Sequence, residues 1–299
     1  MEGAEAAGIT ERVSLAVAAK ASAENFPVAL RVLPERWRKH LTALYGFARL
    51  TDDIGDEPLP GLDAATTPPD VYTATRLRLL DELRQDVARL YEGGTPELAV
   101  MRELKETVTE CGVPRQPFED LIAANRQDQV VTRYQTYDDL VQYCELSANP
   151  VGRVVLYIMG AATPDRLGLS DNICTALQLA EHWQDVAEDL GNGRVYLPQE
   201  DLKAFGVTEE ALARPAADDA VRRLMAFETA RARQLLDQGA PLAGTLKGAA
   251  RLAISGYIAG GRAALAAIAK ADYDVLARTP KPSKAATLAG LVSCYVTGR

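Results

Sequence analysis

Most of this sequence consists of long stretches with the periodicity of amphipathic helices, and no segment shows the alternation that is typical of strands. Alanine and leucine are frequent, whereas aromatic residues make up only 6% of the chain, and this mixture favours helix over sheet. A chain of 299 residues is long enough to bury a large core. We therefore predict one all-α domain over residues 21–290, preceded by a flexible N-terminal segment over residues 1–20.

Glycine and proline residues mark where the helices are expected to begin and end. The segment Pro58–Asp70 is rich in proline and is expected to be a loop. Ser170 or Asp171 is the expected N-cap of one long helix. The expected helices cover residues 35–56, 71–91, 96–111, 117–131, 137–148, 151–160, 170–190, 217–238 and 246–271.

Composition excludes several classes of protein. The formal net charge is −8 without a basic tract, which argues against nucleic-acid binding, and an anionic substrate would require recruited cations. Four dispersed cysteines and two histidines match neither a zinc site nor a disulfide framework. No run of about 18 apolar residues and no secretory signal is present. We expect a cytoplasmic protein, and peripheral contact with the inner face of the membrane stays open.

Polar residues on two otherwise apolar helices carry the functional information. Tyr45, Arg49, Asp52 and Asp56 follow the spacing i, i+4, i+7 and i+11, which places them on one stripe roughly 60° wide. Gln178, Glu181, Asp185 and Asp189 form a similar stripe about 80° wide. Each stripe ends in two aspartates spaced i, i+4, whose like charges repel each other.

Two interpretations of these stripes are open. Each could be a solvated helix face, but both helices are apolar around most of their circumference, as buried helices are. If both stripes face a cavity, the paired carboxylates need a cation, and an all-oxygen ligand set favours Mg²⁺. Mg²⁺ would make a diphosphate a leaving group, and Arg49 would share its charge. The pattern thus fits the ionisation of a prenyl diphosphate in an apolar cavity.

These motifs also resemble those of a known family. Residues 45–56 (YGFARLTDDIGD) resemble the first aspartate-rich motif of squalene and phytoene synthases, and residues 177–189 with 193–198 resemble the second. The resemblance extends from about residue 20 to residue 280. It implies an isoprenoid-synthase-type helical bundle with a central apolar cavity.

Further segments resemble in particular the bacterial HpnC branch, known as hydroxysqualene synthase. They are residues 24–27, 126–129, 147–152, 183–186 and 194–202. The resemblance implies conversion of presqualene diphosphate, with loss of diphosphate and capture of the carbocation by water, in squalene and hopanoid biosynthesis. It also implies two functional partners: a presqualene diphosphate synthase and a flavin-dependent hydroxysqualene reductase.

Carried over position by position, the resemblance assigns roles to individual residues. Two or three Mg²⁺ ions, bound with the diphosphate, would be held by Asp52, Asp56, Asp185 and Asp189. Substrate contacts are implied for Ser22, Asn25, Phe26, Tyr45, Arg49, Ala148, Asn149, Gln178, Tyr196 and Arg278, with Lys281 as a further candidate.

The chain departs from the family pattern at several positions. Glu181 replaces an asparagine and is either an additional metal ligand or a substitution that weakens the site. Gln184 replaces an arginine common in the family, so both a substrate contact and a structural role are open. His182 stands where the HpnC branch has phenylalanine and is interpreted as a packed residue. Dehydrosqualene synthases have a tyrosine that contacts substrate. The aligned position in this chain falls near Gly260-Gly261, so that contact is not expected here.

Alternative functions are also compatible with the sequence. The same metal chemistry suits a head-to-head prenyl transferase that makes presqualene diphosphate, dehydrosqualene or phytoene. A non-catalytic helical scaffold is the alternative from another class, although all four aspartates are present. A basic cluster around Trp37 (Arg31, Arg36, Arg38, Lys39 and His40) is either a solvated helix start or a contact with anionic lipid.

Overall fold

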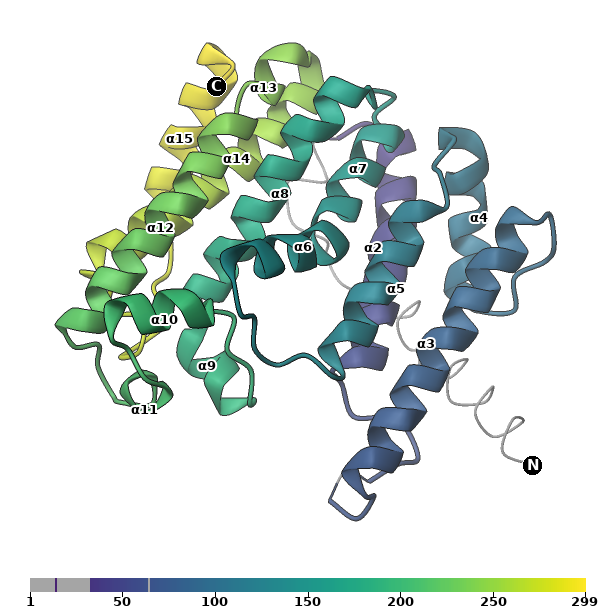
Figure 1. The fold of residues 1–299 in the computed structure, drawn as a ribbon. Coiled ribbons are helices and arrows are strands. Elements are labelled where there is room, and N and C mark those ends of the chain that lie inside the picture. Colours follow the sequence, from purple (N-terminus) through teal and green to yellow (C-terminus); the bar gives the residue numbers. More distant parts are fainter. Residues whose placement is uncertain (1–13, 15–32, 64) are drawn as a thin grey trace. The chain divides into compact units, whose positions relative to one another are not determined.

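The computed structural model describes residue 14 and residues 33–63 and 65–299, and within this part of the chain every regular element is an α-helix (Figure 1). The predicted all-α class is therefore confirmed. The chain divides into two compact units. Unit 1 comprises Met1–Val130 and Arg153–Ala162, and unit 2 comprises Val131–Gly152 and Thr163–Arg299. The expected flexible segment over residues 1–20 lies outside the described residues apart from residue 14, and a single domain over residues 21–290 stays a prediction.

In unit 1, α2 (Glu35–Gly55) packs against α3 (Pro69–Tyr91), α4 (Ala99–Cys111) and α5 (Gln116–Asp128). Phe47 on the buried face of α2 lies edge-on against Phe118 of α5, with 5.0 Å between the ring centroids. This arrangement is favourable for aromatic pairs and adds to the burial of both rings. Packing on three helices thus fixes the position of α2 within unit 1.

In unit 2, α8 (Pro164–Gln184) contacts α6 (Tyr137–Ser147), α12 (Asp219–Gly239), α13 (Leu242–Thr245) and α14 (Gly248–Lys270). The Trp183 side chain is fully buried and anchors the last turn of α8. α15 (Lys284–Thr297) packs on α14 at the yellow end of the chain in Figure 1. The remaining helices are α9 (Val186–Gly191), α10 (Gln199–Phe205), α11 (Glu209–Leu212), and α7 (Asn149–Ile158), which runs from unit 2 into unit 1.

The structure corrects the expected helix over residues 170–190. It begins earlier, at Pro164, because the Thr163 hydroxyl accepts a hydrogen bond from the Arg166 backbone and caps the helix there. It also breaks at Asp185, which has φ −108° and ψ 18° and separates α8 from α9. The sequence pattern does not predict α15, because this helix has few polar residues to reveal a helical period.

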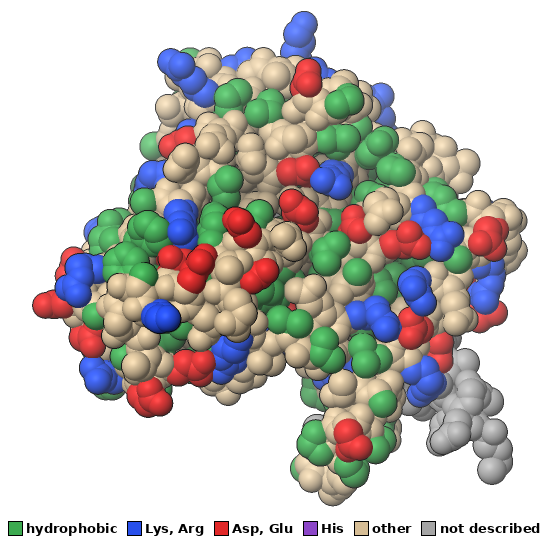
Figure 2. Space-filling model, viewed as in Figure 1, with side chains coloured by type: hydrophobic (Ala, Val, Ile, Leu, Met, Phe, Trp, Pro, Cys, Tyr) green, Lys and Arg blue, Asp and Glu red, His purple; other side chains and the backbone are tan. Residues whose placement is uncertain are grey.

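Among the described helices, α14 is long and apolar enough to cross a membrane, judged by length and composition. It contacts α8, α12, α13 and α15, and 44% of its most apolar stretch is buried inside the protein. A core helix of a globular unit has these same properties. Figure 2 shows Lys and Arg side chains scattered among acidic ones on the face in view, without the concentrated basic patch expected of a nucleic-acid interface on that face.

Candidate active site

The first aspartate pair lies at the C-terminal end of α2. Asp52 belongs to the last turn, Asp56 is the residue that ends the helix, and the Asp56 backbone N–H donates to the Asp52 carbonyl at 2.8 Å. Both side chains are exposed, whereas the intervening Asp53 is buried. Carboxylates at this end of a helix face the negative pole of its dipole, so the location is electrostatically unfavourable without compensating donors.

Side chains from α3 and α5 supply these donors. Arg76 of α3 donates to the Ile54 carbonyl at 2.6 Å and to the Glu57 carbonyl at 3.0 Å. Gln129, which follows α5, donates to the Gly55 carbonyl at 3.2 Å. These bonds satisfy backbone carbonyls that a helix end leaves without partners. The end of α2 is therefore held by neighbouring helices.

Asn125 of α5 extends this support to an aspartate side chain. Its amide nitrogen lies 3.3 Å from Asp52 Oδ1, and its amide oxygen lies so close to Gly55 that an added Cβ there would be only 2.2 Å away. Glycine at position 55 thus makes room for Asn125. Although the Asp52 side chain reaches solvent, the protein packed around it partly desolvates the carboxylate and raises its pKa to about 6, whereas the Asn125 hydrogen bond opposes this shift.

Arg49, one turn before Asp53, has an acidic partner on each side. Its Nε lies 2.6 Å from Asp53 Oδ1, and its Nη2 lies 3.3 Å from Glu57 Oε1. Asp53 does not belong to the predicted metal stripe. It instead holds the guanidinium of Arg49, the residue that the sequence predicts to contact diphosphate. Arg49 and Tyr45 are both half-buried on α2, and their predicted substrate contacts stay predictions.

The second aspartate pair spans the break between α8 and α9. The Asp189 backbone N–H donates to the Asp185 carbonyl at 2.8 Å, so the i, i+4 turn survives although Asp185 is not helical. Asp185 accepts a hydrogen bond from the Thr279 side chain, and its pKa is raised by burial and by Glu188. Gln184 donates to the Pro280 carbonyl, which gives it a structural contact.

Asp189 has the environment expected of a ligand to a cation. Its Oδ2 atom is buried without a hydrogen-bond partner, and burial and the neighbouring Asp185 raise its pKa to about 7. A desolvated carboxylate beside a second carboxylate is stabilised by a divalent ion, so the donors present fit Mg²⁺. Among the described residues, no three His, Cys, Asp or Glu side chains form a ready-made metal cluster. Magnesium binding and the identity of its ligands therefore stay predictions. The role of Glu181, whose side chain is exposed, also stays a prediction.

His182 is packed inside unit 2, as the sequence suggested. Its ring stacks on Tyr196 with 3.7 Å between centroids and an interplanar angle of 14°. Burial and the nearby Arg194 lower the pKa of His182 to about 3, so the imidazole is neutral. Its Nδ1 lies 4.0 Å from Asp189 Oδ2, and its Nε2 lies 3.3 Å from the Gln178 amide nitrogen. A neutral aromatic cluster therefore lies directly beside Asp189.

The segment around Asn149 connects α6 to α7. Asn149 is buried, and its side-chain oxygen accepts a hydrogen bond from the Thr175 hydroxyl at 3.0 Å. A Cβ on Gly152 would lie 2.4 Å from Cys174 Sγ and 2.5 Å from Ser170 Oγ, so the backbone can approach α8 only because this residue is glycine. Asn149 therefore positions this segment within unit 2, and the predicted cavity contacts of Asn149 and Ala148 stay predictions.

Comparison with known proteins identifies the family. A family model described as squalene/phytoene synthase matches residues 19–286, almost the whole chain. The chain belongs to the squalene/phytoene synthase family. It is 35% identical over 225 residues to hydroxysqualene synthase from Rhodopseudomonas palustris, which corresponds to 75% of this chain and 72% of that protein. It is 31% identical over 273 residues to phytoene synthase, chloroplastic, from Daucus carota, covering 89% of this chain and 65% of that protein.

Solved structures also support the assignment to this family. The squalene synthase HpnC from Alicyclobacillus acidocaldarius matches with a TM-score of 0.76 and 36% identity, over 90% of this chain and 95% of that one. A dehydrosqualene synthase in complex with ligand has a TM-score of 0.80 at 23% identity, which supports the fold alone. The predicted isoprenoid-synthase fold is confirmed, and the chain belongs to a family that acts on prenyl diphosphates.

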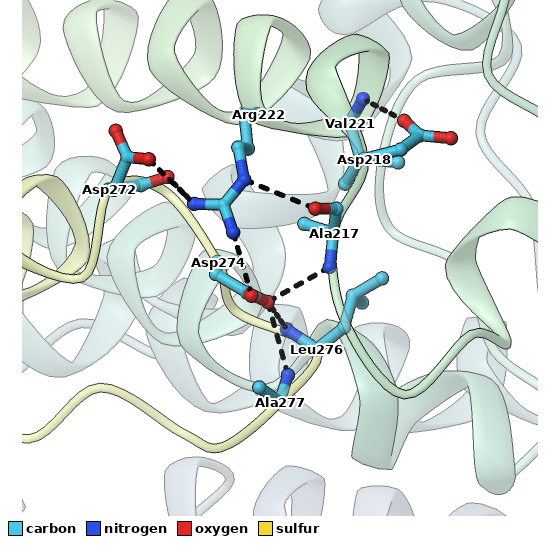
Figure 3. A network of polar contacts seen from close by, with 8 residues as sticks. All are labelled: Ala217, Asp218, Val221, Arg222, Asp272, Asp274, Leu276 and Ala277. Carbon is cyan, nitrogen blue, oxygen red and sulfur yellow. Dashed lines mark hydrogen bonds and ion pairs between the residues drawn. The ribbon is translucent and has the colours of Figure 1, made fainter.

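In this squalene/phytoene synthase family member, a polar network fixes the segment that follows α14 (Figure 3). Arg222 of α12 lies 2.9 Å from both Asp272 Oδ2 and Asp274 Oδ2 and also donates to the Ala217 carbonyl. Burial would raise the pKa of Asp274, but backbone donors, the Ala217 N–H first, and Arg222 hold it below its usual value. The network therefore anchors the start of the segment that leads to Thr279.

A pocket of about 880 Å³ lies between this segment and α14. Three cations line it, Lys270, Arg278 and Lys281, and alanines of α14 form its apolar wall. Because Thr279 and Pro280 contact the second aspartate turn, Arg278 lies one residue from that contact. This placement supports the predicted diphosphate contact of Arg278 without testing it.

Some sequence predictions receive a correction or fall outside the described residues. Ser22, Asn25 and Phe26 are among the undescribed residues. In the cluster around Trp37, Arg36 and Lys39 are exposed, but Trp37 and His40 are buried. The His40 Nδ1 lies 3.0 Å from the Thr107 hydroxyl. Trp37 is therefore not an exposed membrane anchor. Sequence reasoning missed the donors Arg76, Asn125 and Gln129, although Asn125 and Gln129 have the i, i+4 spacing of one helix face.

Proposed function

We propose that this chain is a hydroxysqualene synthase, which converts presqualene diphosphate and water into hydroxysqualene and diphosphate. In this reaction the C–O bond to diphosphate breaks with its electron pair leaving on oxygen. The carbocation rearranges, water adds to carbon, and a proton is released. The observation that carries the proposal is the 35% identity to two hydroxysqualene synthases in a chain that has both aspartate pairs intact.

The residues of this chain would bind the diphosphate and disperse its charge. Asp52, Asp56, Asp185 and Asp189 would hold Mg²⁺ with the diphosphate, and bound Mg²⁺ would neutralise the leaving group. Arg49, oriented by Asp53, and Arg278, from the anchored segment, would add positive charge at its oxygens. His182 and Tyr196, which are stacked on each other and buried beside Asp189, would form a neutral wall next to the diphosphate site.

A second candidate reaction has support from the comparisons. Phytoene synthases are 30–32% identical to this chain, and their name denotes the formation of phytoene. A head-to-head prenyl transferase would use the same carboxylates for the ionisation step. The 35% identity to two hydroxysqualene synthases favours the first reaction.

Product analysis distinguishes the two reactions. Purified protein with Mg²⁺ is incubated separately with presqualene diphosphate and with farnesyl diphosphate, and the lipid extracts are analysed by gas chromatography and mass spectrometry. We expect hydroxysqualene from presqualene diphosphate only, with one ¹⁸O atom when the solvent is H₂¹⁸O. Conversion of farnesyl diphosphate to presqualene diphosphate or a C30 hydrocarbon would contradict the proposal and favour the transferase. No product from either substrate would favour the scaffold alternative.

A further inference from the structure

The C-terminal helix α15 has one apolar face that the described part of the chain does not cover. Its inner face packs on α14, where Gly290 approaches Ala259 and Cys294 is buried. On its outer face, Leu288 is 62% exposed, Val292 56%, Tyr295 39% and Val296 72%. These four residues follow the spacing i, i+4, i+7 and i+8, so they form one continuous stripe on a helix.

This stripe is unusual within the molecule. Elsewhere in the described chain, large exposed apolar side chains lie apart from one another, such as Val71 on α3 and Val130 in the turn after α5. No charged residue occurs from Ala285 to Gly298, so nothing interrupts the stripe along α15. Scattered exposed apolar residues need no explanation, but a contiguous stripe indicates an interaction surface.

The charges around this stripe are strongly biased towards cations. From Lys247 to Arg299 the chain has eight Lys or Arg residues and two acidic ones, although its overall net charge is −8. Both acids, Asp272 and Asp274, are already paired with Arg222. Arg262 is likewise paired with Asp237, at 2.7 Å, but the C-terminal region still has more cations than acids, while the rest of the chain is acidic.

Several of these cations border α15. Lys281 and Lys284 are exposed at its N-terminal end, and Arg299 is exposed just after its C-terminal end. Arg251 of α14 lies over the Tyr295 ring, 5.4 Å from its centroid, and donates to the Val296 carbonyl at 3.2 Å. An apolar stripe bordered by cations is the pattern of a helix that lies in a membrane interface.

We propose that the outer face of α15 docks on a bilayer surface that contains anionic lipid, with the apolar stripe among the acyl chains and the bordering cations at the headgroups. Cations at both ends of α15 would repel those of a second copy across a two-fold axis, in either orientation of the paired helices, whereas they attract anionic headgroups. The proposal goes beyond the proposed reaction and does not depend on it.

Vesicle co-sedimentation tests the proposal. Full-length protein is mixed with vesicles of phosphatidylcholine alone or with 30 mol% phosphatidylglycerol, at low and at high salt. The test variant is Val292→Asn with Val296→Asn, and the control variant, Val71→Asn with Val130→Asn, removes two exposed valines outside α15. We expect the wild type to bind anionic vesicles at least about tenfold more tightly than neutral ones, with a loss of binding at high salt. The test variant should lose about tenfold or more, and the control should match the wild type.

Three outcomes would overturn the proposal. One is equal binding of the wild type to neutral and anionic vesicles, or no binding to either. A second is an equal loss of binding in the test and control variants, when circular dichroism shows both to be folded. The third is a wild-type dimer in light scattering that the α15 substitutions convert to a monomer, because a second copy of the chain would then occupy this face.

Discussion

Glu228 on α12 is a buried carboxyl group with an incomplete set of partners. Its side chain is fully buried, Oε2 has no hydrogen-bond partner, and Oε1 lies 3.5 Å from Arg231 Nη1. Arg231 is bonded more closely to Asp201, at 2.6 Å, and lies between the rings of Tyr137 and Phe227. One guanidinium therefore balances one carboxylate, and the second carboxyl group is more stable when protonated.

The pKa of Glu228 gives the size of the effect. Burial, followed by the hydrogen bond to Asp201, raises it from 4.5 to about 8. A raised pKa means that the folded state binds the proton more tightly. The stabilisation is therefore complete below about pH 4.5 and is lost as the pH rises through about 8. At about 1.4 kcal/mol per pKa unit, the wild type should lose about 4 kcal/mol between pH 5 and pH 9 from this group.

Glu228→Gln removes this titration while keeping the size of the side chain. Urea unfolding followed by circular dichroism at pH 5, 7 and 9 gives the free energy of unfolding of both proteins. We expect the variant to gain on the wild type by about 4 kcal/mol from pH 5 to pH 9. Glu145→Gln, an exposed position on α6, serves as the control and should follow the wild type. A constant difference between Glu228→Gln and the wild type across this range would refute the reasoning.

Three further predictions concern the proposed metal ligands, the hydrogen bond that Asn125 makes to one of them, and the close approach of Gly152 to α8. Asp52→Asn and Asp185→Asn should each nearly abolish turnover with unchanged helical content, because each removes a proposed metal ligand; normal activity in both would remove these residues from the mechanism. Asn125→Leu should raise the Mg²⁺ concentration for half-maximal activity by about tenfold, as loss of a supporting hydrogen bond does, and an unchanged Mg²⁺ profile would show that Asn125 does not support Asp52. Gly152→Ala should lower the free energy of unfolding in urea by about 1–3 kcal/mol through overpacking against α8, and an equally stable variant would show that the backbone can move away.

The sequence predicted the helices well where polar and apolar residues alternate with a clear helical period. It identified α2 and the end of α4 at residue 111, where Gly112 follows with a positive φ of 64° and so leaves a local signal. It did not predict α15, whose exposed face is apolar. A helix pattern is recognised by its contrast of polar and apolar faces, and α15 lacks this contrast because its outer face is itself apolar.

The candidate site shows the same division. Spacing alone placed the aspartates of each pair on one helical turn, because an i, i+4 relation follows from helix geometry. It did not predict the break at Asp185, nor the hydrogen bonds that reach Asp52 from Asn125 and Asp185 from Thr279. These contacts join residues that are far apart in the chain, and only the packed fold brings such residues together.

The most direct test of the central claim, that both aspartate pairs bind divalent ions together with a diphosphate, is a Mn²⁺ titration followed by electron paramagnetic resonance with inorganic diphosphate present. The account predicts tight Mn²⁺ binding to the wild type only when diphosphate is present, and a large loss in both Asp52→Asn and Asp185→Asn. Binding of Mn²⁺ and diphosphate to either variant with wild-type affinity and stoichiometry would contradict it, because that pair would then take no part in holding the ions.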